Sequence, residues 1–165
     1  MADLHEEITP VAGGSYDYAE LSGVNYQGAE LSTARFYRAR LVNANLRGAN
    51  LEGAYCFEAD LEGTDFSNAN LRGAFLTEAN LKYCNFSGAD LSGANLSGSK
   101  LSGANFTGAN LKKAKISRVN MNGVELRDAN LAGSFLYESL LTGALHGDFT
   151  RARIMPRPWL EPPSE

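Results

Sequence analysis

Several features that define common protein classes are missing from this 165-residue sequence. No run of 18 apolar residues occurs, so we expect no membrane-spanning helix. The N-terminal residues have neither a basic region nor an apolar run, so we expect no secretory signal and a cytoplasmic location. A net charge of −4 and a pI near 5.2 do not favour direct binding to nucleic acid or to a membrane.

Side chains that could carry catalysis or bind a metal are also scarce. The two histidines, His5 and His146, lie near opposite ends of the chain, and no phosphate-binding, dinucleotide-binding, zinc-protease or nucleophile-elbow motif occurs. The two cysteines, Cys56 and Cys84, fall on interior positions of the repeat described below, so we expect buried, unpaired thiols, which suit a reducing compartment. We therefore predict no enzyme activity, no cofactor, no metal site and no small-molecule substrate.

What the sequence does contain is a period of five residues. From Tyr16 to Leu141, in steps of five, 26 consecutive positions are apolar, and 17 of them are Leu; we call this the core position. Two residues earlier, at the corner position, 17 of 26 are Ala, and two residues later, at the turn position, 14 of 26 are Gly. A period of five fits neither a helix nor an alternating strand, and it predicts a solenoid.

The repeating unit Ala-(Asn/Asp)-(Leu/Phe)-x-Gly, as at 44–48, 49–53, 69–73 and 89–93, resembles the pentapeptide-repeat family. The resemblance covers about three quarters of the chain. It implies a right-handed quadrilateral parallel β-helix with four repeats, or 20 residues, per coil, and hence about six and a half coils for 26 repeats. Members of this family are abundant in cyanobacteria and many have no assigned role, so the resemblance implies a bacterial protein.

The residues agree with this fold on their own terms. Large apolar side chains at the core position can fill the coil, and we predict a core of stacked phenylalanines that includes Phe36, Phe66, Phe86 and Phe106. A small corner residue lets the backbone turn closely, Gly at the turn position accepts positive φ, and Asn or Asp before the core position can bond neighbouring backbone groups.

The frame of five divides the chain into three segments. Residues 1–13 form a lead-in or N-terminal cap, 14–146 form the repeat, and 147–165 form a frame-shifted C-terminal cap and a Pro-rich tail. Leu4, Ile8 and Val11 would cover the first coil, because an exposed coil end presents unpaired backbone and an apolar core. After His146 a new frame begins three residues later, at Phe149 and Ile154, and Trp159 and Leu160 would cover the last coil or bind a partner.

One of the four faces differs from the others. A face recurs every 20 residues, and the face with Tyr16, Phe36 and Leu136 at its core position carries seven of the eight outward aromatics of the repeat; Tyr83 is the exception. We call this face the aromatic wall. It has Gly at the turn position only at Gly98. Its candidate interaction residues are Tyr18, Tyr37, Arg38, Tyr55, Phe57, Phe75, Phe135 and Tyr137.

Two interpretations of this wall stay open. Exposed aromatics clustered among charges are typical of interfaces, so the wall is a candidate binding surface for an unidentified protein or for a second copy of the chain. Alternatively, the aromatics stack as a ladder along the rod and stabilise it without a partner. The scarcity of Gly would then reflect a turn type that does not need Gly.

The sequence accordingly favours a rigid, non-enzymatic scaffold for protein–protein interaction. The resemblance implies an alternative, because some pentapeptide-repeat proteins resemble B-form DNA in shape and charge and bind DNA gyrase, protecting it from quinolones or toxins. Residues 16–141 contain 13 acidic and 12 basic side chains, a net of −1, whereas a mimic of DNA should be strongly negative. The repeat also lacks the protruding loops of gyrase-protecting members, and the Pro-rich C-terminus lacks their apolar dimerisation helix.

Overall fold

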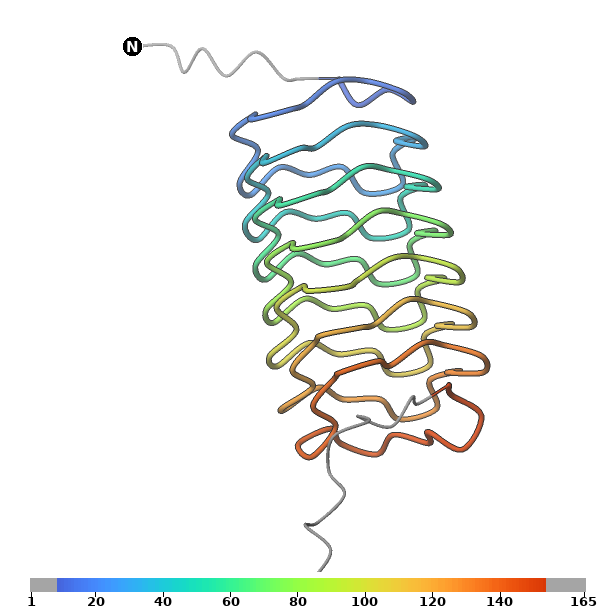
Figure 1. The fold of residues 1–165 in the computed structure, drawn as a ribbon. Helices are drawn as coiled ribbons and strands as arrows, with labels where there is room; N and C mark the ends of the chain where they lie inside the picture. Colours follow the sequence, from blue (N-terminus) through green and yellow to red (C-terminus); the bar gives the residue numbers. More distant parts are fainter. Residues whose placement is uncertain (1–8, 154–165) are drawn as a thin grey trace, which may run out of the picture.

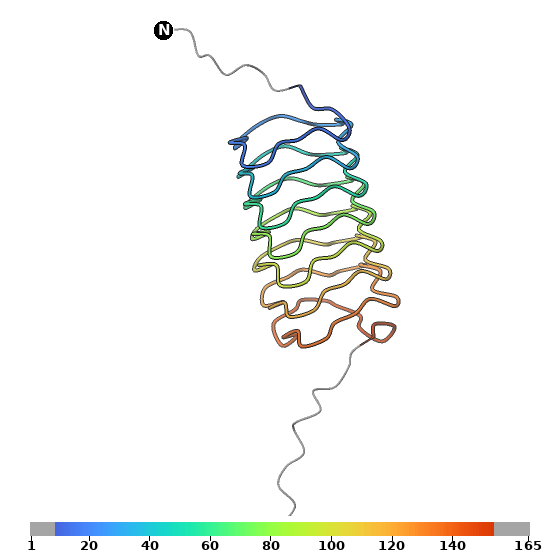
Figure 2. The ribbon, with the colours of Figure 1, turned by 45° about the horizontal axis from the view of Figure 1, so that its top comes forward.

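The chain winds into a rod of stacked coils (Figures 1 and 2). The structure is a computed structural model that describes residues 9–153, and the chain advances along the rod from one end to the other (Figure 1). Within 9–153 there is no α-helix and no strand longer than a single bridge. Accordingly, this part of the chain contains no helix long and apolar enough to cross a membrane.

Neighbouring coils are joined by isolated parallel bridges. Each bridge up to Glu125–Leu145 joins the residue before a core position to the residue 20 positions later, beginning with Ser15–Arg35. The Tyr16 amide donates to the Arg35 carbonyl at 2.7 Å. A constant interval of 20 residues means four repeats per coil, so the predicted coil length is confirmed.

Each repeat ends in a tight turn of one backbone geometry. The amide of Ala74 donates to the Leu71 carbonyl at 3.0 Å, and the same bond recurs along the rod. The turn position has positive φ in every repeat from 18 to 138. Positive φ at the third residue of a turn defines type II, for which Gly is the least strained residue.

The aromatic wall uses this same turn. Its turn positions have φ of 61° at Tyr18, 53° at Arg38, 56° at Glu58 and 58° at Glu78, close to the 56–72° of the other faces. The interpretation that this wall uses a turn type without a need for Gly is therefore wrong. The closure of the coil keeps φ positive at this position, whichever residue occupies it.

The interior is a continuous column of core and corner residues. Phe36, Phe66, Phe86 and Phe106 are among the largest fully buried side chains. Phe86 stacks on Phe66 and Phe106 with ring centroids 5.0 and 4.7 Å apart, whereas Phe36 stacks on Tyr16 in a different column, at 5.0 Å. Burying each such ring stabilises the rod by about 1.5–3 kcal/mol.

Amide side chains connect the coils on the other faces. The Asn70 side-chain amide donates to Asn50 Oδ1 at 3.0 Å, and its own Oδ1 accepts the backbone amide of Arg72 at 3.2 Å. The same pair of bonds recurs where Asn45 meets Asn25 and the Arg47 amide. These bonds satisfy polar groups along the outside of the turns, as expected for Asn in tight turns. On the aromatic wall, larger side chains occupy most of the equivalent positions.

The last coil is shorter than the others. The bridge from Phe135 to Arg153 spans 18 residues, and the Arg153 amide donates to the Ser134 carbonyl at 2.7 Å. The register change thus falls between 146 and 153, where a change of frame was expected.

The caps are described only in part. At the N-terminal end Val11 is 51% exposed, and its amide donates to the Tyr16 hydroxyl at 2.8 Å. Leu4, Ile8, Ile154, Trp159 and Leu160, which were expected to form or extend the two caps, lie outside the described residues. The three segments 1–13, 14–146 and 147–165 stay a prediction.

Candidate interaction wall

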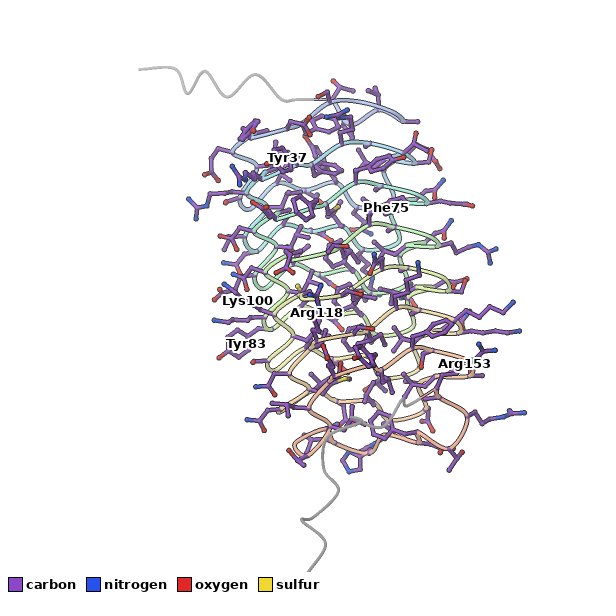
Figure 3. All side chains as sticks on the ribbon, viewed as in Figure 1. Tyr37, Phe75, Tyr83, Lys100, Arg118 and Arg153 are labelled. Carbon is purple, nitrogen blue, oxygen red and sulfur yellow. The ribbon has the colours of Figure 1, made fainter. Side chains whose placement is uncertain are left out.

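The aromatic wall presents three columns of outward side chains. The leading column, one residue before the core position, contains Arg35, Tyr55, Phe75, Asn95, Lys115 and Phe135. The trailing column, one residue after it, contains Tyr37, Phe57, Thr77, Ser97, Ser117 and Tyr137. The turn column contains Tyr18, Arg38, Glu58, Glu78, Gly98, Arg118 and Glu138. Figure 3 shows Tyr37, Phe75 and Arg118 along the rod, with Tyr83 and Lys100 projecting at a different side.

The first half of the wall is a stacked aromatic surface. Tyr37 and Phe57 lie with ring centroids 5.8 Å apart and planes 7° from parallel, and Tyr55 and Phe75 lie 4.9 Å apart at 3°. Tyr18 meets Tyr37 edge to face at 5.3 Å. Phe57, Phe75 and Tyr55 nevertheless remain 39–48% exposed. The ladder is therefore present, and it leaves a large apolar area in contact with solvent.

The second half of the wall holds two separate rings beside a recess. Phe135 and Tyr137 are 38% and 40% exposed, and within residues 9–153 neither contacts another aromatic ring. The guanidinium of Arg153 lies 5.2 Å from the centre of the Phe135 ring. A shallow hollow of about 240 Å³ lies beside these rings and is lined by Ser97, Lys115, Ser117, Phe135, Tyr137 and Arg153.

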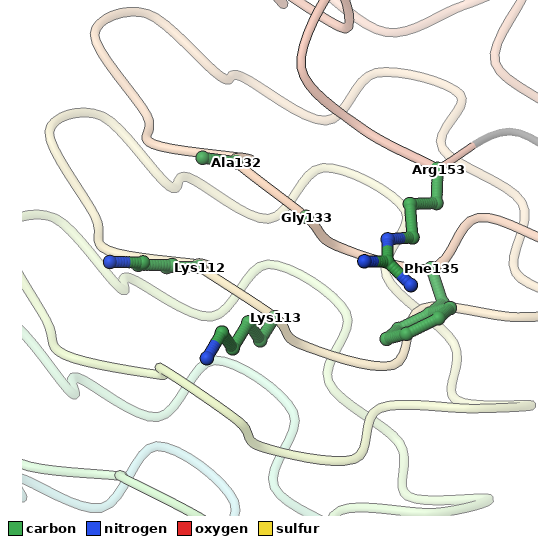
Figure 4. A pocket seen from close by; sticks show the side chains of 6 residues that line it. All are labelled: Lys112, Lys113, Ala132, Gly133, Phe135 and Arg153. Carbon is green, nitrogen blue, oxygen red and sulfur yellow. The ribbon is translucent and has the colours of Figure 1, made fainter.

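A second hollow adjoins the first at the edge of the wall. Its volume is about 450 Å³, and Lys112, Lys113, Ala132, Gly133, Phe135 and Arg153 line it. Figure 4 shows the Arg153 guanidinium beside the Phe135 ring, on the opposite side from Lys112 and Lys113. The surface of the second half of the wall is thus recessed, and cationic side chains line the recess.

The charges of the two halves of the rod have opposite sign. Residues 9–98 contain six basic and ten acidic side chains, a net of −4, and residues 99–153 contain eight basic and four acidic, a net of +4. In the first half, Arg35 pairs with Asp17 at 2.8 Å and Arg38 with Glu58 at 2.5 Å. Within the described part of the chain, the cations Lys112, Lys113, Lys115, Arg118 and Arg153 form no ion pair.

Three ionisable groups of the wall have raised pKa values. Loss of solvent contact raises the pKa of Tyr37 against the opposing charge of Arg38, and the hydrogen bond with Glu58 raises the pKa of Arg38. The hydrogen bond with Glu138 raises the pKa of Tyr137. Near neutral pH, Tyr37 and Tyr137 are therefore neutral phenols and Arg38 is a cation, which suits recognition.

The thiols lie away from this surface. Burial raises the pKa of Cys56 to about 12 and raises the pKa of Cys84 as well. The Cys84 sulfur contacts the Leu61 carbonyl at 3.0 Å, and both cysteines are free. Because the thiolate is the reactive form, these buried thiols are poor nucleophiles.

The fold is therefore a parallel β-helix built from five-residue repeats. The family model of pentapeptide repeats matches the chain in eight copies, over residues 17–53, 59–98 and 89–128. The chain belongs to the pentapeptide-repeat family. A comparison with curated protein sequences finds no match.

Two of the solved structures that match this chain, those of QnrB1 and Rfr23, share its fold. A trypsin-treated R167E form of QnrB1, a plasmid-mediated fluoroquinolone resistance protein, is 23% identical with a TM-score of 0.64, over 87% of this chain and 79% of that one. Rfr23 from the cyanobacterium Cyanothece 51142 is 23% identical with a TM-score of 0.50, over 82% and 88%. HetL from Nostoc sp. strain PCC 7120, involved in heterocyst differentiation regulation, is 26% identical with a TM-score of 0.38, over 86% and 76%.

Sequence reasoning grouped the seven aromatics as one surface, whereas the structure separates them into a stacked half and a recessed half. The signal was present in the trailing column, where Tyr37 and Phe57 give way to Thr77, Ser97 and Ser117 before Tyr137. The ion pair between Arg38 and Glu58 could also be anticipated, since the two residues stand 20 positions apart on one column.

Proposed function

We propose that this protein is a rigid, non-enzymatic scaffold for protein–protein interaction that works in the cytoplasm through its aromatic wall. The scaffold is a right-handed quadrilateral β-helix of about six and a half coils, counted as 26 repeats at four per coil. The observation that carries this proposal is the choice of residues at the turn positions of the wall. These positions have positive φ and contain Tyr, Arg and Glu, whereas the positions with positive φ on the other faces are mostly Gly.

The energetics of these turns support a role for the side chains. A residue other than Gly in the left-handed region costs roughly 1–2 kcal/mol, less for Asn and Asp. On the wall this cost recurs at Tyr18, Arg38, Glu58, Glu78, Arg118 and Glu138. Ion pairs between exposed side chains, such as Arg38 with Glu58, contribute at most about 1 kcal/mol and do not offset it reliably. Since the buried core already offsets this cost, we infer that these side chains are kept for what they contact outside the rod.

The stacked rings support the same surface as a binding site. Rigid aromatic side chains bury a large area with little loss of conformational entropy, which is why interfaces are rich in them. Stacking fixes the rings of Tyr37, Phe57, Tyr55 and Phe75 before any partner arrives. A prearranged surface loses less entropy on binding.

A second candidate function is binding to DNA gyrase as a mimic of DNA. The similarity in fold to QnrB1, a fluoroquinolone resistance protein, is the observation in its favour. The net charge of +4 on residues 99–153 argues against it, because a mimic of duplex DNA needs negative charge along its whole length.

Affinity capture from a lysate of the source organism tests the proposal. The baits are wild-type protein, a variant with Tyr37, Phe57, Phe75 and Tyr137 replaced by Ser, and the control Tyr83→Ser. Tyr83 is a suitable control because it is 65% exposed on another face. Circular dichroism of each bait checks that the fold is kept.

We expect wild type and Tyr83→Ser to retain a partner protein that the four-ring variant loses. Gyrase subunits retained equally by all three baits would favour the second candidate function. Loss of the fold in the four-ring variant would mean that the rings are mainly a structural ladder.

A further inference from the structure

The turn column of the aromatic wall has a self-complementary order of charge. Along six successive coils it reads Arg38, Glu58, Glu78, Gly98, Arg118 and Glu138. Two copies can face each other across a two-fold axis that lies in the wall and runs perpendicular to the rod. This arrangement reverses the direction of one rod and keeps each column opposite the same column of its partner.

One register pairs these charges. When the axis passes midway between the coils of Glu78 and Gly98, Arg38 lies opposite Glu138 and Glu58 lies opposite Arg118. Sliding one copy by one coil places Arg38 opposite Arg118 or Glu58 opposite Glu138, depending on direction. Sliding by two coils places Glu78 opposite Glu58 or Glu138. Since like charges across an interface are unfavourable by several kcal/mol, the charges select the first register.

The trailing column fits in this same register. Tyr37 lies opposite Tyr137, Phe57 opposite Ser117, and Thr77 opposite Ser97. The protruding ring of Phe57 in the stacked half therefore meets the recess lined by Ser97 and Ser117. Large side chains facing small ones give the shape complementarity that interfaces need.

The leading column also fits. Tyr55 lies opposite Lys115 and Arg35 opposite Phe135, so that a cation faces a ring in both pairs. Phe75 lies opposite Asn95. The acidic half of each rod, with a net of −4, lies against the basic half of the other, with a net of +4. The unpaired cations Lys115 and Arg118 thereby gain partners.

We propose that the aromatic wall binds a second copy of this chain, antiparallel and in this register. The inference rests on the proposed function, because it names the partner of the same wall. Six coils at a spacing of about 4.8 Å give a strip roughly 24 Å long. A strip one wall wide is smaller than a standard interface of about 800 Å² per partner, so the dimer should be of micromolar affinity.

The register also contains one unfavourable contact, which makes it testable. The Glu78 carboxylate lies over Gly98 of its own chain, where a Cβ on Gly98 would collide with it. Across the two-fold axis the Glu78 side chains of the two copies come together. Glu78→Gln should therefore tighten the dimer, whereas loss of a charge elsewhere in the turn column should weaken it.

Sedimentation velocity over micromolar to submillimolar protein concentrations tests the dimer with the variants R118E and E58R. Each variant alone places like charges opposite each other twice, and each should dimerise at least roughly tenfold more weakly than wild type. An equimolar mixture of R118E and E58R restores two opposite-charge pairs and should dimerise again. K100E is the matched control, because Lys100 is exposed on another face, and it should behave as wild type.

A wild-type protein that stays monomeric over this range would overturn the inference, as would a mixture that fails to recover dimers. A dimer that R118E leaves unchanged would show a different surface. If wild type is monomeric while the four-ring variant still loses a captured protein, the scaffold function stands and the self-association is wrong. If dimers form and the lysate gives no other partner, both proposals hold.

Discussion

The aromatic wall and the other three faces share one backbone and differ in their side chains. From 18 to 138, Gly occupies 12 of the 18 turn positions on the other faces and one of seven on the wall, yet φ lies between 53° and 72° at all of them. On the other faces, the turn positions are mostly Gly, the residue that adopts positive φ with the least strain. The wall has other residues at all but one of its turn positions, so the conformation of the local backbone does not explain the side chains there.

The comparison separates what builds the rod from what the rod presents. The core and corner columns are alike behind all four faces, and Ala34, Ala74, Leu76 and Leu91 are fully buried. Because this interior stabilises every coil, one face can accept strained turns without loss of the fold. Strain that the surrounding structure imposes is common at functional sites.

The largest expected effect tests whether the interior common to all faces holds the rod. Phe86→Ala removes a fully buried ring stacked between Phe66 and Phe106, and it should lower the free energy of unfolding by about 3–5 kcal/mol. Tyr83→Ala, at an exposed position, should change it by less than about 0.5 kcal/mol. Urea denaturation followed by circular dichroism measures both. Equal losses in the two variants would mean that the exterior matters as much as the core.

The next effect tests the cost of positive φ on a glycine face. Gly73 has φ of 63°, and an added Cβ would meet nothing within 4 Å. Gly73→Ala should therefore lower the free energy of unfolding by about 1–2 kcal/mol through backbone strain alone. The measurement is again urea denaturation. An unchanged urea midpoint would show that a residue other than Gly causes no strain in this turn. The difference in Gly content between the faces would then have no effect on stability.

The converse change on the wall should be stabilising. Arg118→Gly relieves strain at φ 56° and removes a side chain with no ion pair within residues 9–153, so we expect a gain of about 1 kcal/mol. Denaturation at low protein concentration measures the monomer. The same variant should dimerise more weakly, by sedimentation. A variant that is less stable as a monomer would mean that Arg118 supports its own coil.

The smallest effect sharpens the distinction between the ladder and the interface. A double-mutant cycle of Tyr55→Ser and Phe75→Ser should give a coupling of about 0.5–1.5 kcal/mol, because these rings stack at 4.9 Å. The same cycle for Phe135 and Tyr137, which make no ring contact in the described chain, should give a coupling near zero. Coupling of equal size in both cycles would contradict the division of the wall into two halves.

Much of this architecture follows from the sequence. The unbroken frame of five places each core position, and a single interval of 20 residues then sets every neighbour between coils, from Ser15–Arg35 onward. The change of frame after His146 marks the short last coil. A repeat is predictable in this way because each unit meets nearly the same surroundings, so one register determines all the contacts.

The turns of the aromatic wall could not be inferred from residue types. One of the two sequence interpretations attributed the scarcity of Gly to a different turn type, but φ is 56° at Glu58 and Arg118, in the same positive region as the 63–72° of the turn glycines. Closure of a four-sided coil under hydrogen bonds to both neighbours imposes the turn, and those bonds outweigh the local preference of one residue.

The sequence by itself determined the period, the buried columns and which side chains share a face. Only the tertiary structure decided which of those side chains stack, which charges already have partners and where the wall is recessed. Arg38 reaches Glu58 on the next coil, while Arg118 has Gly98 on one side and forms no ion pair among the described residues. Such contacts depend on the conformations of neighbouring side chains in space, which a linear period does not contain.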